Sequence, residues 1–170
     1  STGSLGQGFS FAIGEAYGLR LQGVQNRVYV MIGDGEMQEG EIWEGAMFAA
    51  HHSLANLCAI VDYNKLQSDD RNSNIMGLEP LVEKWTAFGW NVIEIDGHVS
   101  NEISEAFKTA SNTVKQPSII IANTVKGKGV SFMENVPSWH GSVKMTPEDL
   151  TLALVELGAD DLEIERALNG

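Results

Sequence analysis

Short apolar runs bounded by turn residues occur at four places along the chain, and this pattern predicts buried strands. The predicted strands are 27–32, 57–63, 90–95 and 118–124. Apolar residues at helical spacing between these runs predict helices. The predicted helices are 4–21, 41–52, 80–88, 101–114 and one that starts at 146–149. Because strands and helices alternate, the sequence predicts an α/β fold: a doubly wound, mostly parallel sheet with helices on both faces.

Two polar or glycine-containing stretches, 67–74 and 126–141, are predicted loops. The length of 170 residues suits one globular domain, and no internal repeat or low-complexity tract is visible. We therefore expect a single domain over 1–170. The chain begins at Ser1 without a methionine, which favours a start inside a domain that lacks its N-terminal part.

The composition is strongly acidic, with 11 Lys and Arg against 23 Asp and Glu, for a net charge of −12. Such a charge argues against a nucleic-acid partner or an anionic membrane surface. No apolar stretch approaches the length of a membrane-spanning helix, and no signal peptide is visible. The single cysteine, Cys58, lies in an apolar run and is expected to be buried. Because one cysteine cannot form a disulfide within the chain, we expect a cytoplasmic location.

The segment with the clearest chemistry is Gly33-Asp34-Gly35-Glu36, which follows the first predicted strand. Ligands of open α/β sheets bind at the carboxyl ends of the strands. Asp34 offers a hard oxygen ligand, and Asn64 ends the next strand thirty residues later. Mg²⁺ prefers oxygen ligands with one or two carboxylates and a substrate phosphate. The alternative interpretation is an ordinary Asp-Gly turn and a strand-terminating asparagine.

The segments VMIGDGEMQEGEIWEGAMFAA and AIVDYNKLQ resemble the thiamine-diphosphate motif of transketolases. This resemblance implies that the Asp34 and Asn64 side chains and the Leu66 carbonyl oxygen bind Mg²⁺ or another divalent cation. It also implies the thiamine-diphosphate-binding fold. The cofactor-binding set that it implies in this segment is Gly33, Asp34, Gly35, Glu36 and Asn64.

Three further segments are similar to the same family. Gly3-Ser4-Leu5-Gly6-Gln7-Gly8 resembles the family's GPLGQG, which implies that Gly3 and Leu5 lie against the cofactor. Residues 125–135 resemble the loop that follows the fourth strand. Ser138-Trp139-His140-Gly141 resembles the family's WHG, which implies that His140 reaches the cofactor and substrate. The alternative for His140 is a water-exposed loop histidine.

This sequence departs from the family in three respects. Ser4 replaces the proline of GPLGQG, and Asp70 replaces the glycine that follows the metal-binding loop. A glycine replaced there changes the turn that the loop can adopt. The segment that precedes GPLGQG in transketolases, with its active-site histidines, has no counterpart in this sequence.

The combination of motifs is most similar to the N-terminal subunit of split transketolases. The resemblance implies transfer of a two-carbon ketol unit between sugar phosphates, and a partner C-terminal subunit that carries the pyrimidine-binding domain. It also implies a homodimer or a dimer of such pairs. Glu39 and Glu44 match acids that link two active sites across that dimer, although acids are also common near helix N-termini.

Two other functions stay open at this point. One is a different thiamine-diphosphate enzyme, such as a 2-oxo acid decarboxylase or dehydrogenase or a deoxyxylulose-phosphate synthase. The other is a truncated domain with a structural or regulatory role and no activity. The expectation that follows from the resemblance is that this chain does not catalyse ketol transfer alone.

Overall fold

The structure is a computed structural model that describes residues 2–141 and 143–169. Its centre is a four-stranded sheet in the order β1 (Val28–Gly33), β2 (Leu57–Tyr63), β4 (Ser118–Asn123) and β3 (Asn91–Asp96). All three neighbouring pairs are parallel, and Gly33 lies opposite Asp62, so that β1 and β2 end side by side. The predicted fold class, an α/β parallel sheet, is confirmed.

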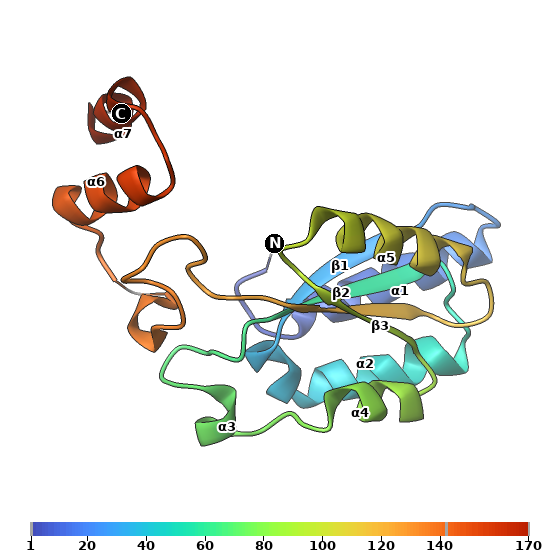
Figure 1. Cartoon of the computed structure of the whole chain (residues 1–170). Coiled ribbons are helices and arrows are strands. Elements are labelled where there is room, and N and C mark those ends of the chain that lie inside the picture. Colours follow the sequence, from blue (N-terminus) through green and yellow to red (C-terminus); the bar gives the residue numbers. More distant parts are fainter. Residues whose placement is uncertain (1, 142, 170) are drawn as a thin grey trace. The chain divides into compact units, whose positions relative to one another are not determined.

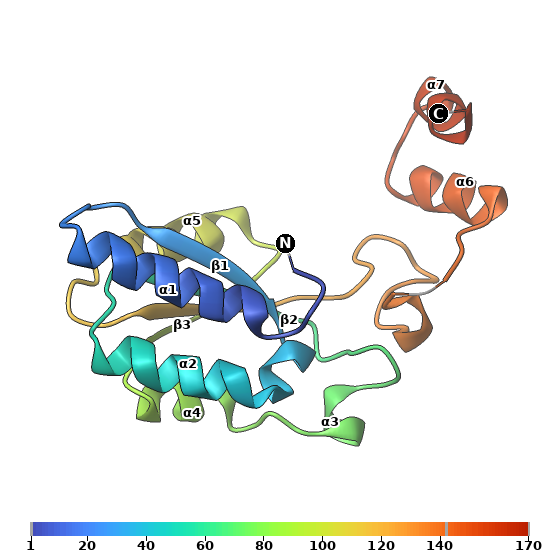
Figure 2. The same ribbon diagram turned by 180° about the vertical axis from the view of Figure 1, so that it is seen from behind.

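Helices cover both faces of the sheet (Figures 1 and 2). On one face, α1 (Gln7–Leu21), α2 (Gly40–His51) and α4 (Leu81–Ala87) enclose the larger core. On the other face, α5 (Ser100–Asn112) packs a smaller core that includes Ala106 and Ala110. The buried strand residues are continuous apolar runs because both faces of the central strands are covered.

The larger core contains a cluster of aromatic rings from α1, α4 and the residue that precedes β3. The ring centroids of Phe9 and Trp85 lie 6.2 Å apart, and those of Trp85 and Trp90 lie 4.9 Å apart, both in edge-on arrangements. Gly45 lets α2 approach α1 closely, because a Cβ there would come within 2.7 Å of Ile13 Cδ1. The close packing of these two helices therefore depends on the absence of a side chain at Gly45.

The chain forms two compact units. The first comprises 2–65 and 72–124 and contains the sheet with its covering helices. The second comprises 66–71, 125–141 and 143–169 and contains η2 (Pro137–Trp139), α6 (Pro147–Glu156) and α7 (Asp161–Asn169). The expectation of a single domain over 1–170 stays a prediction.

Within the second unit, α6 begins as the sequence predicts. Thr146 is the N-cap, and its side chain and that of Asp149 exchange hydrogen bonds with each other's backbone N–H in a capping box. Pro147 occupies the first turn, where its missing N–H costs nothing. At the other end of α6, the Glu156 carboxylate accepts hydrogen bonds from the backbone N–H and the hydroxyl of Ser131.

Short helical turns form in both of the stretches that are predicted as loops, α3 in the first and η2 in the second. The polar stretch 67–74 is predicted as a loop, but α3 (Asn72–Ile75) forms one helical turn within and beyond its end. The turn is closed by Met76 N–H, which donates to the Asn72 carbonyl oxygen at 2.9 Å. A single turn of polar residues has no apolar periodicity, so the pattern could not indicate it. In the described residues, no helix combines the length and apolar character needed to cross a membrane.

Candidate functional site

Asp34 lies at the carboxyl end of β1, where η1 (Gly35–Gln38) begins. It is only 2% exposed. Its Oδ1 accepts a hydrogen bond from Gly35 N–H at 2.7 Å, and its Oδ2 accepts one from Lys65 N–H at 2.5 Å. Since Lys65 follows the end of β2, the carboxylate joins the ends of two neighbouring strands. The sequence placed Asp34 at this edge, and the structure places it there.

The electrostatic setting of Asp34 favours a bound cation. Burial raises the pKa of its carboxyl group above the ordinary value, and the hydrogen bonds from Lys65 and Gly35 offset this only in part. Both donors are backbone N–H groups, so neither brings a positive charge. A divalent cation at the carboxylate would supply that charge and would favour the ionised form.

Asn64 follows Tyr63, the last residue of β2, and is 6% exposed. It lies at the same edge of the sheet as Asp34, because β1 and β2 are parallel and end together. The next residue, Lys65, has a φ of 67°, in the left-handed region, and its N–H is the one that contacts Asp34. The role of the Asn64 side chain as a metal ligand stays a prediction.

Leu66 and His140 belong to the second unit. Leu66 is 1% exposed and pairs with Arg71 in an antiparallel bridge that closes the 66–71 loop. His140 follows η2 as its C-cap, its N–H donates to the Pro137 carbonyl oxygen at 2.9 Å, and its side chain is half-buried. Metal binding by the Leu66 carbonyl oxygen and a cofactor or substrate role for His140 stay predictions.

Glu36 connects the two glycine-rich segments that the sequence singles out. Its Oε1 accepts a hydrogen bond from Gly6 N–H at 2.8 Å, and its Oε2 accepts one from Gly33 N–H at 3.0 Å. Gly6 has a φ of 85°, which favours glycine, and it stands directly before α1. The carboxylate thereby fixes the start of α1 against the end of β1. The predicted cofactor contact of Glu36 stays a prediction, as does that of Gly35.

The remaining predicted residues lie on the surface. Gly3 and Leu5 are exposed, and no described heavy atom lies within 4 Å of a Cβ built on Gly3. Glu39 is the N-cap of α2 without a capping hydrogen bond, and Glu44 lies in the first half of that helix; both are exposed. Their predicted role as acids that link two active sites stays a prediction.

Asn72 belongs to this edge of the first unit, although the sequence pattern did not indicate it. It is 4% exposed, and its N–H donates to the Lys65 carbonyl oxygen at 3.0 Å. Its side-chain amide lowers the pKa of Asp34, so the two groups are close. Yet among the described residues neither Asn72 Oδ1 nor Nδ2 meets a partner at hydrogen-bond geometry. The signal available from the sequence was only an asparagine eight residues after Asn64.

These residues fit a diphosphate only together with a cation. Asp34 is a buried carboxylate whose charge is not neutralised by its backbone partners, and a bare diphosphate beside it would be repelled. A divalent cation between the two removes that repulsion and takes oxygen ligands from both. The unsatisfied amide of Asn72 is a further polar group at this edge that a hydrated ligand could satisfy.

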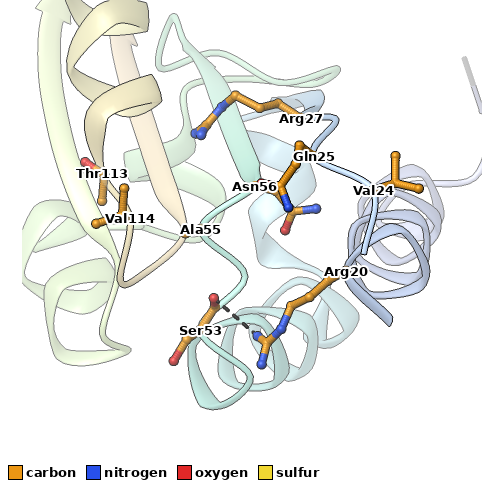
Figure 3. A pocket seen from close by; sticks show the side chains of 9 residues that line it. All are labelled: Arg20, Val24, Gln25, Arg27, Ser53, Ala55, Asn56, Thr113 and Val114. Carbon is orange, nitrogen blue, oxygen red and sulfur yellow. Dashed lines mark hydrogen bonds between the residues drawn. The ribbon is translucent and has the colours of Figure 1, made fainter. Parts of the chain in front are cut away.

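A pocket of about 490 Å³ lies at the opposite edge of the sheet, before the first residues of β1 and β2 (Figure 3). Arg20 donates to the carbonyl oxygens of His52 and Ser53, which follow α2. These carbonyls belong to a helix C-terminus, where a cation is favoured.

The second arginine of this pocket has the same kind of role. Arg27 donates to the carbonyl oxygens of Ala110 and Ser111, at 2.8 and 3.4 Å, near the end of α5. The two guanidinium groups therefore neutralise helix ends. None of the predicted site residues lines the pocket, and we assign the chemistry to the Asp34 edge.

An open parallel sheet with a buried carboxylate at the carboxyl ends of its strands defines an α/β ligand-binding domain. The particular family follows from comparison with known proteins. The family model described as "Transketolase, thiamine diphosphate binding domain" matches residues 1–165. The chain belongs to this family, and the predicted resemblance to transketolases is confirmed.

Two curated relatives are named as subunits of transketolases. The chain is 48% identical over 157 residues to the 6-deoxy-6-sulfo-D-fructose transketolase subunit SqwG of Clostridium sp. (strain MSTE9), covering 92% of this chain and 57% of that one. It is 39% identical over 170 residues to one subunit of the apulose-4-phosphate transketolase of Phocaeicola vulgatus, covering 100% of this chain and 60% of the relative. The chain thus spans a little more than half the length of these relatives.

The solved structures agree with the fold. The crystal structure of transketolase from Campylobacter jejuni superposes with a TM-score of 0.88 at 29% identity, over 96% of this chain and 27% of that one. The parallel sheet and its covering helices therefore occur within the longer chain of a solved transketolase.

Proposed function

We propose that this chain is the thiamine-diphosphate- and Mg²⁺-binding portion of a transketolase. Together with a partner chain, it transfers a two-carbon ketol unit from a ketose phosphate to an aldose phosphate. The observation that carries the proposal is the buried Asp34 carboxylate, which joins the ends of β1 and β2 and lacks a positively charged partner in its two hydrogen bonds. Membership of the thiamine-diphosphate-binding family supports the choice of cofactor.

In this proposal the residues of the chain bind and orient the cofactor. Asp34, Asn64 and the Leu66 carbonyl oxygen would hold the divalent cation and, through it, the diphosphate. Glu36 holds the backbone at Gly6 and at Gly33 together through two hydrogen bonds. The backbone beside the diphosphate is therefore fixed before binding. His140 acts as a proton donor or acceptor toward cofactor and substrate near pH 7. When bound, thiamine diphosphate supplies the nucleophilic carbon that takes up the two-carbon unit.

The partner in this proposal is a C-terminal transketolase subunit that carries the pyrimidine-binding domain. The names of the two curated relatives, both of which are subunits, support this choice. Glu39 and Glu44 would lie in the surface that joins two such pairs. The exposed side chains of Met47 and Phe48 on the same helix add apolar area to it.

Two classes of donor sugar are candidates in this proposal. A ketose phosphate is the donor that the family resemblance implies, and one relative is named for a phosphorylated sugar. The 48% identical relative is named for a sulfonated ketose, and this observation favours a sulfonated donor as the second candidate. The chain has one cysteine, Cys58, which cannot form a disulfide within the chain, and we propose a cytoplasmic location.

The test is reconstitution of activity. We expect no ketol transfer from xylulose 5-phosphate to ribose 5-phosphate by this chain alone, and turnover once the C-terminal subunit, thiamine diphosphate and Mg²⁺ are present. Asp34→Ala should abolish that turnover. Asp96→Ala is the matched control, because Asp96 ends β3 at the same edge but is exposed.

Three outcomes would contradict the proposal. Robust turnover by the chain alone, lost in Asp34→Ala, would show that no partner is needed. Transfer from 6-deoxy-6-sulfo-D-fructose but not from xylulose 5-phosphate would replace the phosphorylated donor by the sulfonated one. Absence of turnover with every donor in the complete mixture would favour a structural or regulatory role.

A further inference from the structure

Asn72 is a buried polar residue of the first unit, and packing in that unit does not explain why an asparagine stands there. It is 4% exposed, and among the described residues both polar atoms of its amide lack a hydrogen-bond partner. Each buried polar group left without a partner costs roughly 1–3 kcal/mol. An apolar side chain of the same shape would fill the space without that cost, so packing alone does not account for an asparagine here.

The position of Asn72 connects it to Asp34 through the backbone of one residue. Asn72 N–H donates to the Lys65 carbonyl oxygen at 3.0 Å, and Lys65 N–H donates to Asp34 Oδ2 at 2.5 Å. Asp34 therefore holds the N–H of Lys65, and Asn72 holds its carbonyl oxygen. The Asn72 amide interacts with Asp34, although neither of its polar atoms makes a hydrogen bond of normal geometry.

The two unsatisfied atoms need different partners. Nδ2 is a donor and can be satisfied by an oxygen of Asp34 or of a diphosphate, whereas Oδ1 is an acceptor and needs a donor. A carboxylate or a phosphate oxygen cannot donate, but a water molecule held by a divalent cation can. Mg²⁺ usually keeps several of its waters in protein sites. A hydrated cation with a diphosphate therefore satisfies both atoms at once.

We propose that Asn72 is a positioning residue of the cation site, whose amide donates to Asp34 or the diphosphate and accepts from a cation-bound water. The inference rests on the proposed function, because it takes Asp34 as the cation ligand. It adds a residue that is not a ligand itself but holds the ligand and the hydrated cation in place. Such supporting hydrogen bonds typically change metal affinity by about 10- to 100-fold.

The test uses Asn72→Leu, which keeps the shape and removes both polar atoms. In urea unfolding without cation, we expect this variant to be as stable as the wild type or more stable, because two unsatisfied groups are gone. In calorimetric titration with thiamine diphosphate and excess Mg²⁺, we expect its Kd to rise about 10- to 100-fold. Asn74→Leu, two residues away and exposed, is the matched control and should leave the Kd unchanged.

A second variant keeps the test decisive if Asn72→Leu does not fold. Asn72→Asp places a second carboxylate beside Asp34, so we expect a lower Tm without cation and a larger Tm increase than the wild type when Mg²⁺ is added. An increase equal to that of the wild type would overturn the proposal. So would a Kd for Asn72→Leu equal to that of the wild type.

The wild-type titration separates failure of the positioning role of Asn72 from failure of the cation site at Asp34. If the wild type binds thiamine diphosphate and Mg²⁺ but both Asn72 variants bind equally well, only the positioning role fails. If the wild type does not bind, the cation site at Asp34 fails and the role of Asn72 fails with it.

Discussion

The carboxylate of Glu36 holds the backbone of Gly6 from thirty residues away, and with its second oxygen it holds Gly33. This relationship ties the start of α1 to the end of β1 and thereby unites two glycine-rich segments that are separate in the sequence. Glu36 is half-buried, and its two hydrogen bonds leave neither oxygen without a partner. The geometry of the candidate site therefore depends on one side chain that need not touch the ligand.

We expect Glu36→Ala to lower the free energy of unfolding by about 2 kcal/mol, because two backbone N–H groups lose a charged acceptor. Glu36→Gln should lie between the wild type and alanine, since an amide has only one acceptor oxygen. Urea unfolding measures both. Glu15→Ala, an exposed glutamate of α1, is the control and should change the stability by no more than about 0.5 kcal/mol. Equal stability of Glu36→Ala and Glu15→Ala would contradict the bridging role.

Sequence patterns predict the strands and their ends, but they do not predict contacts between residues that are far apart in the chain. The strand 57–63 was predicted with the bounds that the structure shows, because a short apolar run between turn residues favours a buried strand over a longer helix. Asp34 was placed at the strand end for the same reason. The contact of Glu36 with Gly6 joins positions thirty residues apart, and that of Arg27 with Ala110 joins positions 83 apart. Spacing along the chain does not encode such contacts.

Asn72 shows the same limit in a polar segment. Nothing in the stretch 67–74 distinguishes one asparagine from its polar neighbours, and only the fold buries Asn72 while it exposes Asn74. The roles of Leu66 and His140 came from the resemblance and not from local pattern, because a backbone carbonyl carries no sequence signal. These roles stay predictions.

The hydrogen bond from Tyr63 to Glu79 predicts a dependence of stability on pH. It lowers the pKa of the Glu79 carboxyl, and the Leu81 N–H adds to the effect. A group with a lowered pKa in the folded state stabilises the fold above its unfolded pKa of about 4.3, and this contribution is lost as the pH falls through the folded value. We expect Glu79→Gln to make the unfolding free energy less sensitive to pH on the acid side.

The magnitude of this effect should be less than about 1 kcal/mol, because Glu79 is exposed and solvent screens its charge. Tyr63→Phe should remove part of the same dependence, and the two changes should not add in the double variant. Urea unfolding across the acid range measures all three. Full additivity would show that the two side chains do not interact in solution.

Replacement of Arg27 should lower the stability of the fold without changing ligand binding at the Asp34 edge. Arg27→Ala removes a charge-assisted hydrogen bond to the Ala110 carbonyl oxygen at 2.8 Å, and we expect a loss of about 1–2 kcal/mol in unfolding free energy. The affinity for thiamine diphosphate with Mg²⁺ should stay the same, because the pocket lies at the opposite edge of the sheet. A weaker affinity at unchanged stability would assign the Arg20 and Arg27 pocket to the ligand.

Substitutions on the exposed face of α2 should weaken the assembly of the enzyme. Met47 is 55% exposed, and we expect Met47→Glu to dissociate the assembled enzyme because a charge would be buried in the interface. Glu39→Ala should lower the turnover of the assembled enzyme. Sedimentation velocity and steady-state kinetics measure the two effects. Met76→Glu, with a methionine of similar exposure, is the control for assembly. Unchanged assembly in Met47→Glu and unchanged turnover in Glu39→Ala would refute the linking surface.

The central claim is that a divalent cation at Asp34 holds the diphosphate of the cofactor. Calorimetric titration of thiamine diphosphate into the chain tests it most directly, first with Mg²⁺ and then with EDTA in place of Mg²⁺. We predict weak but measurable binding with Mg²⁺, since this chain holds only the diphosphate end, and none with EDTA. Asp34→Asn should remove the Mg²⁺-dependent binding, and Asp96→Asn should keep it. Binding that is equal with Mg²⁺ and with EDTA, or that survives in Asp34→Asn, would contradict the account.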